Sequence, residues 1–344
     1  MISLDKKILD PSSAVAARMV EHGKEEELFI IVPSKEAAQL DLSAQVHVAG
    51  SGGSKKISQL WKLYRLGYNL IKTNEPDSIT TQDPFFSGLI GLFLKQKFKI
   101  PLEVQVHGDF YAPSNYYRWG GWFHRERWWL GLMVLSYADT VRVMSERVRA
   151  SLVNGLRLNE SKIFVRPIAV DSALIKNYEP KINLHNCYPG FKKIFLCLGR
   201  LDPVKNIPWL IRLFVEIIKW QPEYLLLVVG SGPDKDKITA LIKELHLEKN
   251  IKLEDWTNDP LSYIKTADGA LFPSLSEGYG LVPMEAHYVG TPLIMNDVGV
   301  ANYELKPNDK ARPRTVPSRD GTSAWVKILP INDKEKWIEA ILSI

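Results

Sequence analysis

The chain has 344 residues, of which 45% are hydrophobic and 24% charged, and it carries a formal net charge of +5. This length suits two domains with separate cores, and the composition excludes a disordered or low-complexity chain. Its two cysteines, Cys187 and Cys197, are too few for a secreted disulfide framework. Residues 1–10 lack the apolar core of a signal peptide, and the longest apolar patch is too short to span a bilayer. We therefore expect a cytoplasmic protein, with a peripheral position at the inner face of the membrane as an open alternative.

Short apolar runs alternate with amphipathic stretches in the first half of the chain. The pattern predicts strands over 2–4, 28–32, 45–49, 78–81 and 102–106, and helices over 14–21, 57–72 and 85–97, with a further helix that ends at Leu152. Alternation on this scale indicates a parallel sheet that helices cover on both faces. Gly52 and Gly53 lie in a glycine-rich loop that lacks the Lys-Ser/Thr of a P-loop. The loop either lines one side of a ligand cleft or is only a turn.

Positive charge and tryptophan are concentrated in the first half. Residues 1–170 contain 22 Lys and Arg against 17 Asp and Glu, and four of the ten tryptophans fall between 119 and 129. A basic, tryptophan-rich segment is typical of an interfacial membrane helix. The alternative is a helix packed on the domain with a few exposed aromatic side chains. Both interpretations stay open at this point: a peripheral membrane contact through residues 116–130, and a helix packed on the domain.

Residues 172–192 show no periodicity and read as an interdomain linker. A second alternating series follows, with strands predicted over 194–198, 225–229, 251–253, 269–272 and 293–295. Helices are predicted over 208–220, 281–290 and 333–342, the last capped by Asp333. The expected domains are residues 1–171 and 193–330, with a C-terminal helix in 331–344.

The stretch from Phe272 to Glu304 carries the clearest functional pattern. A strand ends in a loop with Glu277, Gly278 and Gly280, and a short helix then starts near Leu281. Unpaired N–H groups at such a helix start favour an anion. The flanking carboxylates, Glu277 and Glu285, would repel that anion, so they make sense as acceptors for hydroxyl groups on the same ligand. A nucleotide-diphosphate sugar supplies both the hydroxyl groups and the anion.

This loop resembles the E-x7-E signature of glycosyltransferase family 4, a retaining family also called glycosyl transferases group 1. The segment G-R-L-D-P-V-K-N at 199–206 resembles the donor motif of that family, and 138–146 and 162–171 resemble two further segments. The usual Asn-Gly is replaced by Ile168 and Ala169. The resemblance implies the GT-B architecture: α/β, with two Rossmann-like doubly wound domains that face a cleft. In that architecture residues 1–171, with the loop of Gly52 and Gly53, would bind the acceptor, and residues 193–330 would bind the nucleotide-sugar donor.

The resemblance also implies roles for individual residues. Arg200 and Lys205 would neutralise the diphosphate and stabilise it as it leaves. Glu277 would bind hydroxyl groups of the donor sugar, and Glu285 would bind the ribose. Backbone N–H groups of the Gly278, Tyr279, Gly280 and Leu281 run would hold sugar and phosphate. His107 matches the first-domain histidine of the family, which helps at the reacting face, and Asp109 beside it is a further candidate on the acceptor side.

These residues predict a hexosyltransferase that uses a UDP- or GDP-sugar donor and a glycan or lipid-linked acceptor, with no required cofactor and no nucleic acid partner. We expect no metal site, because the D-K-D at 234–236 follows a glycine-rich turn and reads as a helix start. A nucleotide-sugar epimerase on the same scaffold remains an alternative, as does a non-catalytic, membrane-bound sugar-nucleotide-binding module. A nicotinamide dehydrogenase is disfavoured because no G-x-G-x-x-G follows a strand.

Overall fold

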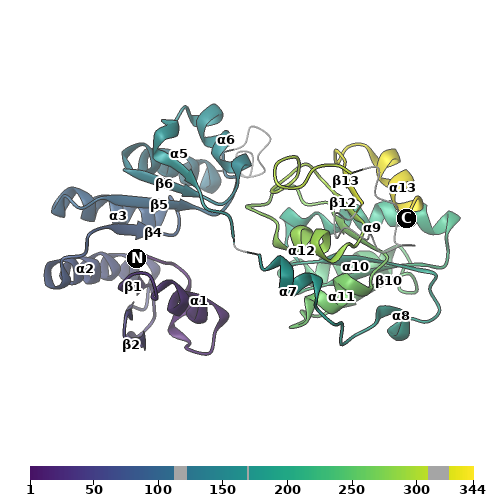
Figure 1. Cartoon of the computed structure of the whole chain (residues 1–344), viewed down its shortest axis with the longest axis horizontal. Helices are drawn as coiled ribbons and strands as arrows, with labels where there is room; N and C mark the ends of the chain where they lie inside the picture. The colour runs from purple at the N-terminus through teal and green to yellow at the C-terminus, as the bar shows by residue number, and fades with distance from the viewer. Residues whose placement is uncertain (112–121, 169, 309–324) are drawn as a thin grey trace. The chain divides into compact units, whose positions relative to one another are not determined.

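The computed structural model describes residues 1–111, 122–168, 170–308 and 325–344. Two compact units divide the chain, Met1–Arg166 and Pro167–Ile344 (Figure 1). Each unit is an α/β structure with parallel strands, which confirms the fold class predicted from the alternation of strands and helices. Residues 116–121 of the predicted membrane segment lie outside the described residues, as does Ala169.

The first unit contains seven strands and the helices that connect them within the described residues. The strands are β1 (Leu28–Val32), β2 (Ala37–Ser43), β3 (Val46–Ser51), β4 (Ile79–Thr81), β5 (Leu102–Val106), β6 (Thr140–Val143) and β7 (Ile163–Val165). The helices are η1 (Lys6–Leu9), α1 (Ala14–His22), α2 (Lys56–Asn74), α3 (Phe86–Phe98), α5 (Trp122–Tyr137), α6 (Glu146–Leu156) and η2 (Glu160–Lys162).

These strands form two groups, in the orders β1-β3-β2 and β4-β5-β6-β7. Ile2 forms parallel bridges to both Ile31 and Thr81, so the start of the chain joins the groups, although the predicted strand over 2–4 is reduced to these bridges. The antiparallel strand β2 was not predicted. It is largely exposed and therefore lacks an apolar pattern, and its hydrogen bonds to β3 define it.

The second unit contains six strands in its described part. They are β8 (Lys193–Leu198), β9 (Tyr224–Val229), β10 (Ile251–Glu254), β11 (Gly269–Phe272), β12 (Leu293–Met295) and β13 (Val326–Ile328). The helices are α7 (Ser172–Lys176), α8 (Leu184–Cys187), η3 (Pro203–Lys205), α9 (Ile207–Trp220), α10 (Lys235–Glu244), α11 (Pro260–Thr266), α12 (Leu281–Val289) and α13 (Lys334–Leu342).

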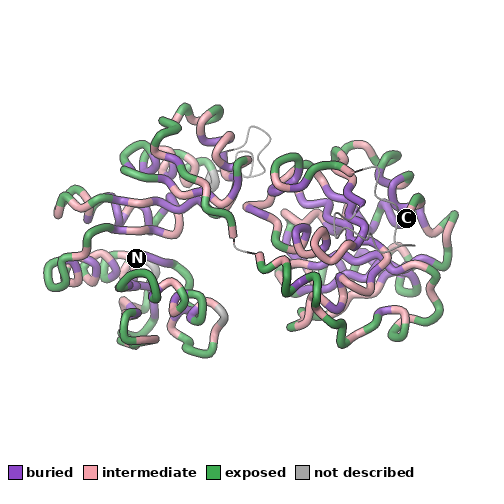
Figure 2. The backbone as a smooth tube through the Cα atoms, viewed as in Figure 1, coloured by how far each residue is buried: buried purple, intermediate pink, exposed green. Residues whose placement is uncertain are grey.

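All neighbouring strands of the second sheet are parallel, in the order β10-β9-β8-β11-β12-β13. Every residue of β9 is buried, as expected for a strand that helices cover on both faces (Figure 2). The helix predicted over 281–290 is α12, and its end at Gly290 in the left-handed conformation is confirmed. Asp333 caps α13 as predicted, since its side chain accepts a hydrogen bond from Lys336 N.

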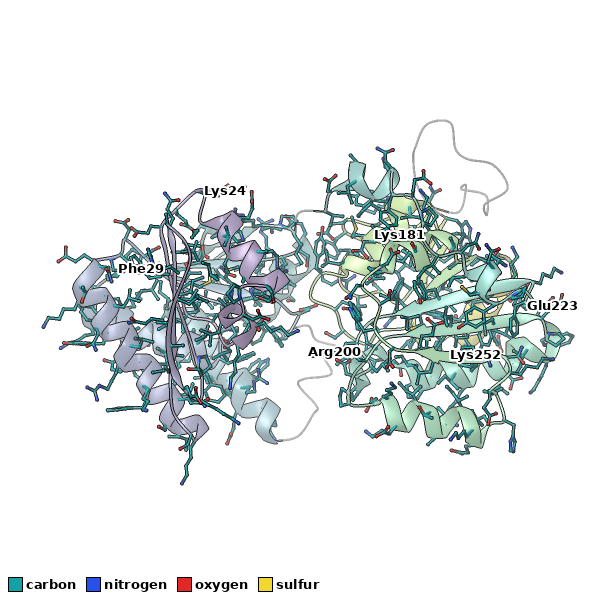
Figure 3. The ribbon with its side chains drawn as sticks, turned by 90° about the horizontal axis from the view of Figure 1, so that it is seen from below. Lys24, Phe29, Lys181, Arg200, Glu223 and Lys252 are labelled. Atoms are coloured by element: carbon teal, nitrogen blue, oxygen red, sulfur yellow. The ribbon has the colours of Figure 1, made fainter. Side chains whose placement is uncertain are left out.

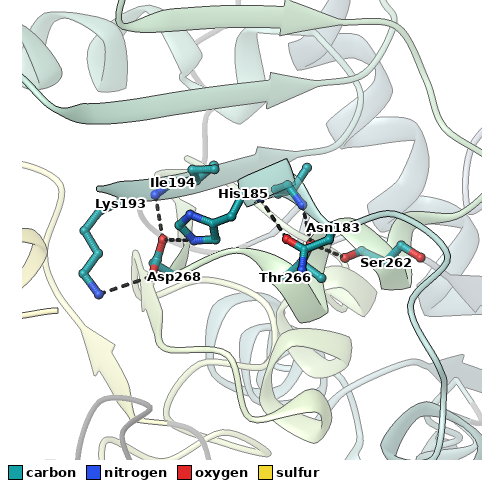
Figure 4. Close-up of polar contacts among 8 residues, drawn as sticks. Asn183, His185, Lys193, Ile194, Ser262, Thr266 and Asp268 are labelled. Carbon is teal, nitrogen blue, oxygen red and sulfur yellow. Dashed lines mark hydrogen bonds and ion pairs between the residues drawn. The ribbon is translucent and has the colours of Figure 1, made fainter. Parts of the chain in front are cut away.

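The residues assigned to the linker include two short helices, α7 and α8, which were not predicted. Part of this segment is fixed to the base of the second sheet through Asp268 (Figure 4). The Asp268 carboxylate accepts a hydrogen bond from Ile194 N (2.8 Å), and His185 Nε2 and Lys193 Nζ lie 2.9 and 3.2 Å from it. Residues near 185 therefore pack with the second unit.

Candidate active site

The sheet of the second unit has a switch point between β8 and β11. From β8 the chain builds outward through β9 and β10 on one side, and from β11 through β12 and β13 on the other. Open α/β sheets bind ligands at the carboxyl ends of such a pair of strands. Arg200 and Lys205 follow β8, and Glu277 follows β11, so the sequence places all three at this edge.

The structure brings Lys205 and Glu277 into direct contact. Lys205 Nζ lies 2.5 Å from Glu277 Oε1, and only 26% and 15% of the two side chains are exposed. Leu275 N donates a hydrogen bond to Val204 O (2.8 Å), which ties the two loops together beside the pair. A partly desolvated ion pair of this kind presents a cation and a hydroxyl acceptor side by side.

Arg200 has a different partner. Its Nη2 lies 2.5 Å from Asp202 Oδ2, and the Arg200 side chain is largely exposed. Figure 3 labels Arg200 and Glu223 at opposite ends of the second unit; Arg200 follows β8, whereas Glu223 precedes β9. Asp202 itself is buried, and its other oxygen, Oδ1, has no hydrogen-bond partner among the described residues. The guanidinium is therefore anchored on one side and open to solvent on the other.

The start of α12 is built as predicted. Gly280 occupies the N-cap position with φ +108°, a conformation that favours glycine, and no side chain caps the helix. In the described backbone, the N–H groups of Gly278, Tyr279 and Gly280 donate none of the hydrogen bonds found outside helices and strands. These groups are available to an anion.

Glu285 lies one turn into α12 and is half-buried. Burial raises the pKa of its carboxyl above the usual range. A carboxylate in this position gains by accepting hydrogen bonds from a ligand, because these would offset its loss of hydration.

The loop after β12 packs against the loop that carries Glu277. Val300 N donates a hydrogen bond to Tyr279 O (2.8 Å), and Gly299 has φ +58°. A Cβ at Gly299 would lie 2.2 Å from Tyr279 O and 2.8 Å from Glu277 Cβ. The close approach of these two loops thus depends on glycine at position 299.

The candidates of the first unit lie at the carboxyl ends of its strands. His107 follows β5, and its Nδ1 lies 2.9 Å from Met144 Sδ. Although the residue is exposed, desolvation of the ring lowers the pKa of His107 to about 4, with a further contribution from the positive charges of Arg142 and Arg18. Asp109, two residues on, is buried. The imidazole is therefore neutral at pH 7.

Gly52 and Gly53 form the turn after β3, with φ +67° and +130°. Gly52 N donates to Ser34 Oγ (3.0 Å) and Gly53 N to Lys35 O (2.8 Å). Because both N–H groups already donate hydrogen bonds within the protein, a ligand at this loop would have to contact other atoms.

The D-K-D segment opens α10 as predicted. Asp234 occupies the N-cap position, but its side chain lies 3.0 Å from Lys237 Nζ instead of capping the helix. Across the described residues, no group of three or more His, Cys, Asp or Glu side chains is placed to hold a metal ion.

The tryptophans at the end of the predicted membrane segment differ in orientation. Trp128 packs on the core of the first unit, with its ring 6.0 Å from that of Tyr111, whereas Trp129 is 62% exposed. No helix in the described parts of the chain combines the length and the apolar character needed to cross a membrane.

Two residues near the β8–β11 edge of the second sheet, Asp202 and Gly299, had no predicted role. Asp202 could have been suspected from its position two residues after Arg200 in a loop that follows a buried strand. Gly299 had no sequence signal beyond being a glycine between two strands, because the contact that requires it joins separate loops.

Comparison with known proteins places these features in a family. Residues 13–174 match the family model described as Glycosyltransferase Family 4, and residues 188–315 match Glycosyl transferases group 1. A UDP-Gal:alpha-D-GlcNAc-diphosphoundecaprenol alpha-1,3-galactosyltransferase of Escherichia coli is 25% identical over 248 residues, 70% of this chain and 62% of the relative. Alpha-monoglucosyldiacylglycerol synthase of Streptococcus pneumoniae is 27% identical, over 65% of this chain and 53% of the relative. Each match covers less than two thirds of the relative's own length.

Solved structures share the fold. Sucrose-phosphate synthase from Thermosynechococcus elongatus superimposes with a TM-score of 0.76 at 20% identity, covering 99% of this chain and 88% of that chain. HepE of Anabaena, in complex with UDP and glucose, gives a TM-score of 0.71 at 16% identity over 99% and 89%. The two successive family matches and the two Rossmann-like units identify this chain as a member of the family 4, group 1 glycosyltransferases with the GT-B fold.

Proposed function

We propose that the protein transfers a hexose, with retention of configuration, from a UDP- or GDP-sugar to a glycan or lipid-linked acceptor. The observation that carries the proposal is the meeting of Lys205 and Glu277 at the switch point of the second sheet. One loop supplies cations for a diphosphate, and the other supplies a carboxylate for sugar hydroxyl groups. Retention of configuration follows from the family and not from this geometry.

In the proposed reaction, Arg200 and Lys205 stabilise the negative charge that grows on the departing diphosphate. The free N–H groups before α12 hold phosphate and sugar, Glu277 orients the sugar hydroxyl groups, and Glu285 accepts hydrogen bonds from the ribose. The transition state is oxocarbenium-like, as in other glycosyl transfers. His107, neutral at pH 7, is the candidate for assistance at the reacting face.

Lys205 has to serve two anions in this scheme. In the unliganded protein it neutralises Glu277, and a bound diphosphate would compete for the same ammonium group. An ammonium group has three donors, so Lys205 can contact the phosphate while it keeps Glu277 in place. The ion pair then positions Glu277 before the sugar arrives.

The donor and acceptor classes rest on the relatives. HepE was solved with UDP and glucose, and the E. coli relative is named for a galactose donor linked to UDP and a diphosphoundecaprenol acceptor. We propose a lipid-linked acceptor here for that reason and because the first half of the chain holds the excess positive charge. The corresponding location is the cytoplasm, at the inner face of the membrane.

A panel of UDP- and GDP-sugars, incubated with the protein and assayed for released nucleoside diphosphate, tests the proposal. Slow release with one donor is expected, and Glu277→Gln should abolish it. Mass balance of the sugar separates the alternatives. An epimerase returns a converted donor without release of nucleotide, and a non-catalytic binding module binds donor without any product.

A further inference from the structure

The helices on one side of the first unit carry an unusual combination of exposed apolar side chains and positive charge. Helix α3 packs between α2 and α5, so the three helices are neighbours (Figure 1). Together they contain eight Lys or Arg residues and one acid, Glu126. Their excess of positive charge is larger than the +5 of the whole chain. The rest of the chain is therefore slightly acidic, and the net positive charge of the protein is concentrated on these helices.

Apolar side chains of the same helices project into solvent at helical spacing. Trp61, Phe93 and Trp129 expose 58%, 50% and 62% of their surfaces. Each belongs to a set on one face of its own helix. Among the side chains that the structure describes, this set, which we call the α2–α3–α5 face, is Ile57 and Trp61 of α2, Phe86 and Phe93 of α3, and Trp129, Met133 and Tyr137 of α5.

Cations border this face. Lys62, Arg65, Lys97 and Arg125 are exposed, and Arg65 stacks on the Trp61 ring at 4.8 Å. Two other cations of these helices have partners within the unit: Lys95 pairs with Asp139 at 2.8 Å, and Arg127 stacks over Phe85 at 4.4 Å. Glu75 and Asp77 lie beyond the C-terminal end of α2.

We infer that the α2–α3–α5 face docks on an anionic phospholipid bilayer. Tryptophan, tyrosine and phenylalanine enter the headgroup region, and lysine and arginine are drawn to anionic lipids, each contributing about 1 kcal/mol near the surface. A second copy of the chain is a poor occupant, because an isologous contact would bring two positively charged surfaces together. A nucleic acid would match the charge but not the apolar side chains.

This inference rests on the proposed lipid-linked acceptor and extends the predicted membrane contact from residues 116–130 to the neighbouring helices α2 and α3. Docking through this face would hold the first unit at the membrane where such an acceptor resides. The membrane contact then involves Trp129 and not Trp128, whose ring is directed to the core.

Flotation with lipid vesicles tests the inference. The full chain is mixed with vesicles of phosphatidylglycerol and phosphatidylcholine, or of phosphatidylcholine alone, at 0.1 and 0.5 M NaCl. We expect binding to the anionic vesicles that weakens at high salt, and little binding to the neutral ones. The triple variant Trp61→Ser, Phe93→Ser, Trp129→Ser should lower the partition coefficient at least tenfold. A second variant, Lys62→Glu with Lys97→Glu, leaves the apolar side chains intact and should weaken binding to a similar extent.

Matched controls come from the second unit. Trp220 is 75% exposed at the end of α9, and Lys249 is exposed before β10, so Trp220→Ser and Lys249→Glu should bind vesicles like the wild type. The inference would be overturned if both face variants bound vesicles like the wild type, or if the wild type bound neutral and anionic vesicles equally. It would also be overturned if the wild type formed dimers or nucleic acid complexes that the face variants abolish. Release of nucleoside diphosphate from the donor, measured without vesicles, should be unchanged in the face variants. Its absence from the wild type would count against the proposed function and not against the docking surface.

Discussion

Replacing Gly299 with alanine tests how far the loop that carries Glu277 depends on the loop that follows β12. The new Cβ would lie 2.2 Å from Tyr279 O and 2.8 Å from Glu277 Cβ, so backbone atoms must move. The left-handed conformation at φ +58° adds about 1–2 kcal/mol for alanine. Displacing the packed neighbours adds a further cost of about 1–3 kcal/mol. Because the atoms that move belong to the Glu277 loop, donor binding should suffer as well as stability.

Gly290→Ala is the matched control. Gly290 also has a positive φ, +84°, but nothing lies within 4 Å of the modified position. This control therefore carries the conformational cost alone. The difference in the free energy of unfolding, from urea titrations of both variants, isolates the steric cost of about 1–3 kcal/mol. Calorimetric titration with UDP and GDP should show at least tenfold weaker binding for Gly299→Ala and wild-type binding for Gly290→Ala. Equal stability and equal affinity of the two variants would refute the reasoning.

Three further predictions concern the site. The first is a double-mutant cycle of Lys205→Met, Glu277→Gln and the double variant, measured as the free energy of unfolding. The coupling energy should be about 1–3 kcal/mol, between the values for exposed and buried ion pairs. Additivity of the two single changes would contradict a functional ion pair. The NMR signals of the His107 ring should show no protonation between pH 8 and 5.5, because its folded pKa is about 4. Because that pKa is lowered on folding, the contribution of His107 to stability should be lost as the pH falls from about 6.5 through 4, and His107→Gln should reduce this loss; a midpoint near 6.5 in the native protein would contradict the prediction. Glycosyl transfer should persist in EDTA at the rate measured with Mg²⁺, and loss of activity that added metal restores would show that a metal is required.

The helices and strands that form the β8–β11 edge could be predicted because local sequence signals define them. Gly280, Pro283 and Gly290 mark the start and end of α12 in the sequence, and apolar runs mark the parallel strands on either side. The order of these strands then places the loops of Lys205 and Glu277 next to each other. The rule that ligands bind at the carboxyl ends of parallel strands, together with the resemblance to the family motifs, pointed to these two loops. The strand order and the Lys205–Glu277 contact came from the structure.

The remaining features depend on tertiary contacts. Strand β2 is exposed and is defined by its pairing with β3, so its sequence carries no strand pattern. The polar and apolar residues of α5 are not segregated to opposite faces, so periodicity could not tell that Trp128 packs inward while Trp129 faces solvent. The pairing of Arg200 with Asp202 depends on the path of a short loop. None of these could be read from spacing alone.

Binding of a nucleoside diphosphate to the β8–β11 edge is the central claim, and calorimetry tests it most directly. UDP and GDP are titrated into the wild type, Lys205→Ala and Lys249→Ala. Lys249 precedes β10 and so belongs to the opposite edge of the sheet, which makes it a control for loss of charge alone. The account predicts that one nucleotide binds the wild type and Lys249→Ala equally and Lys205→Ala at least tenfold more weakly. Equal affinity for Lys205→Ala and the wild type would contradict it.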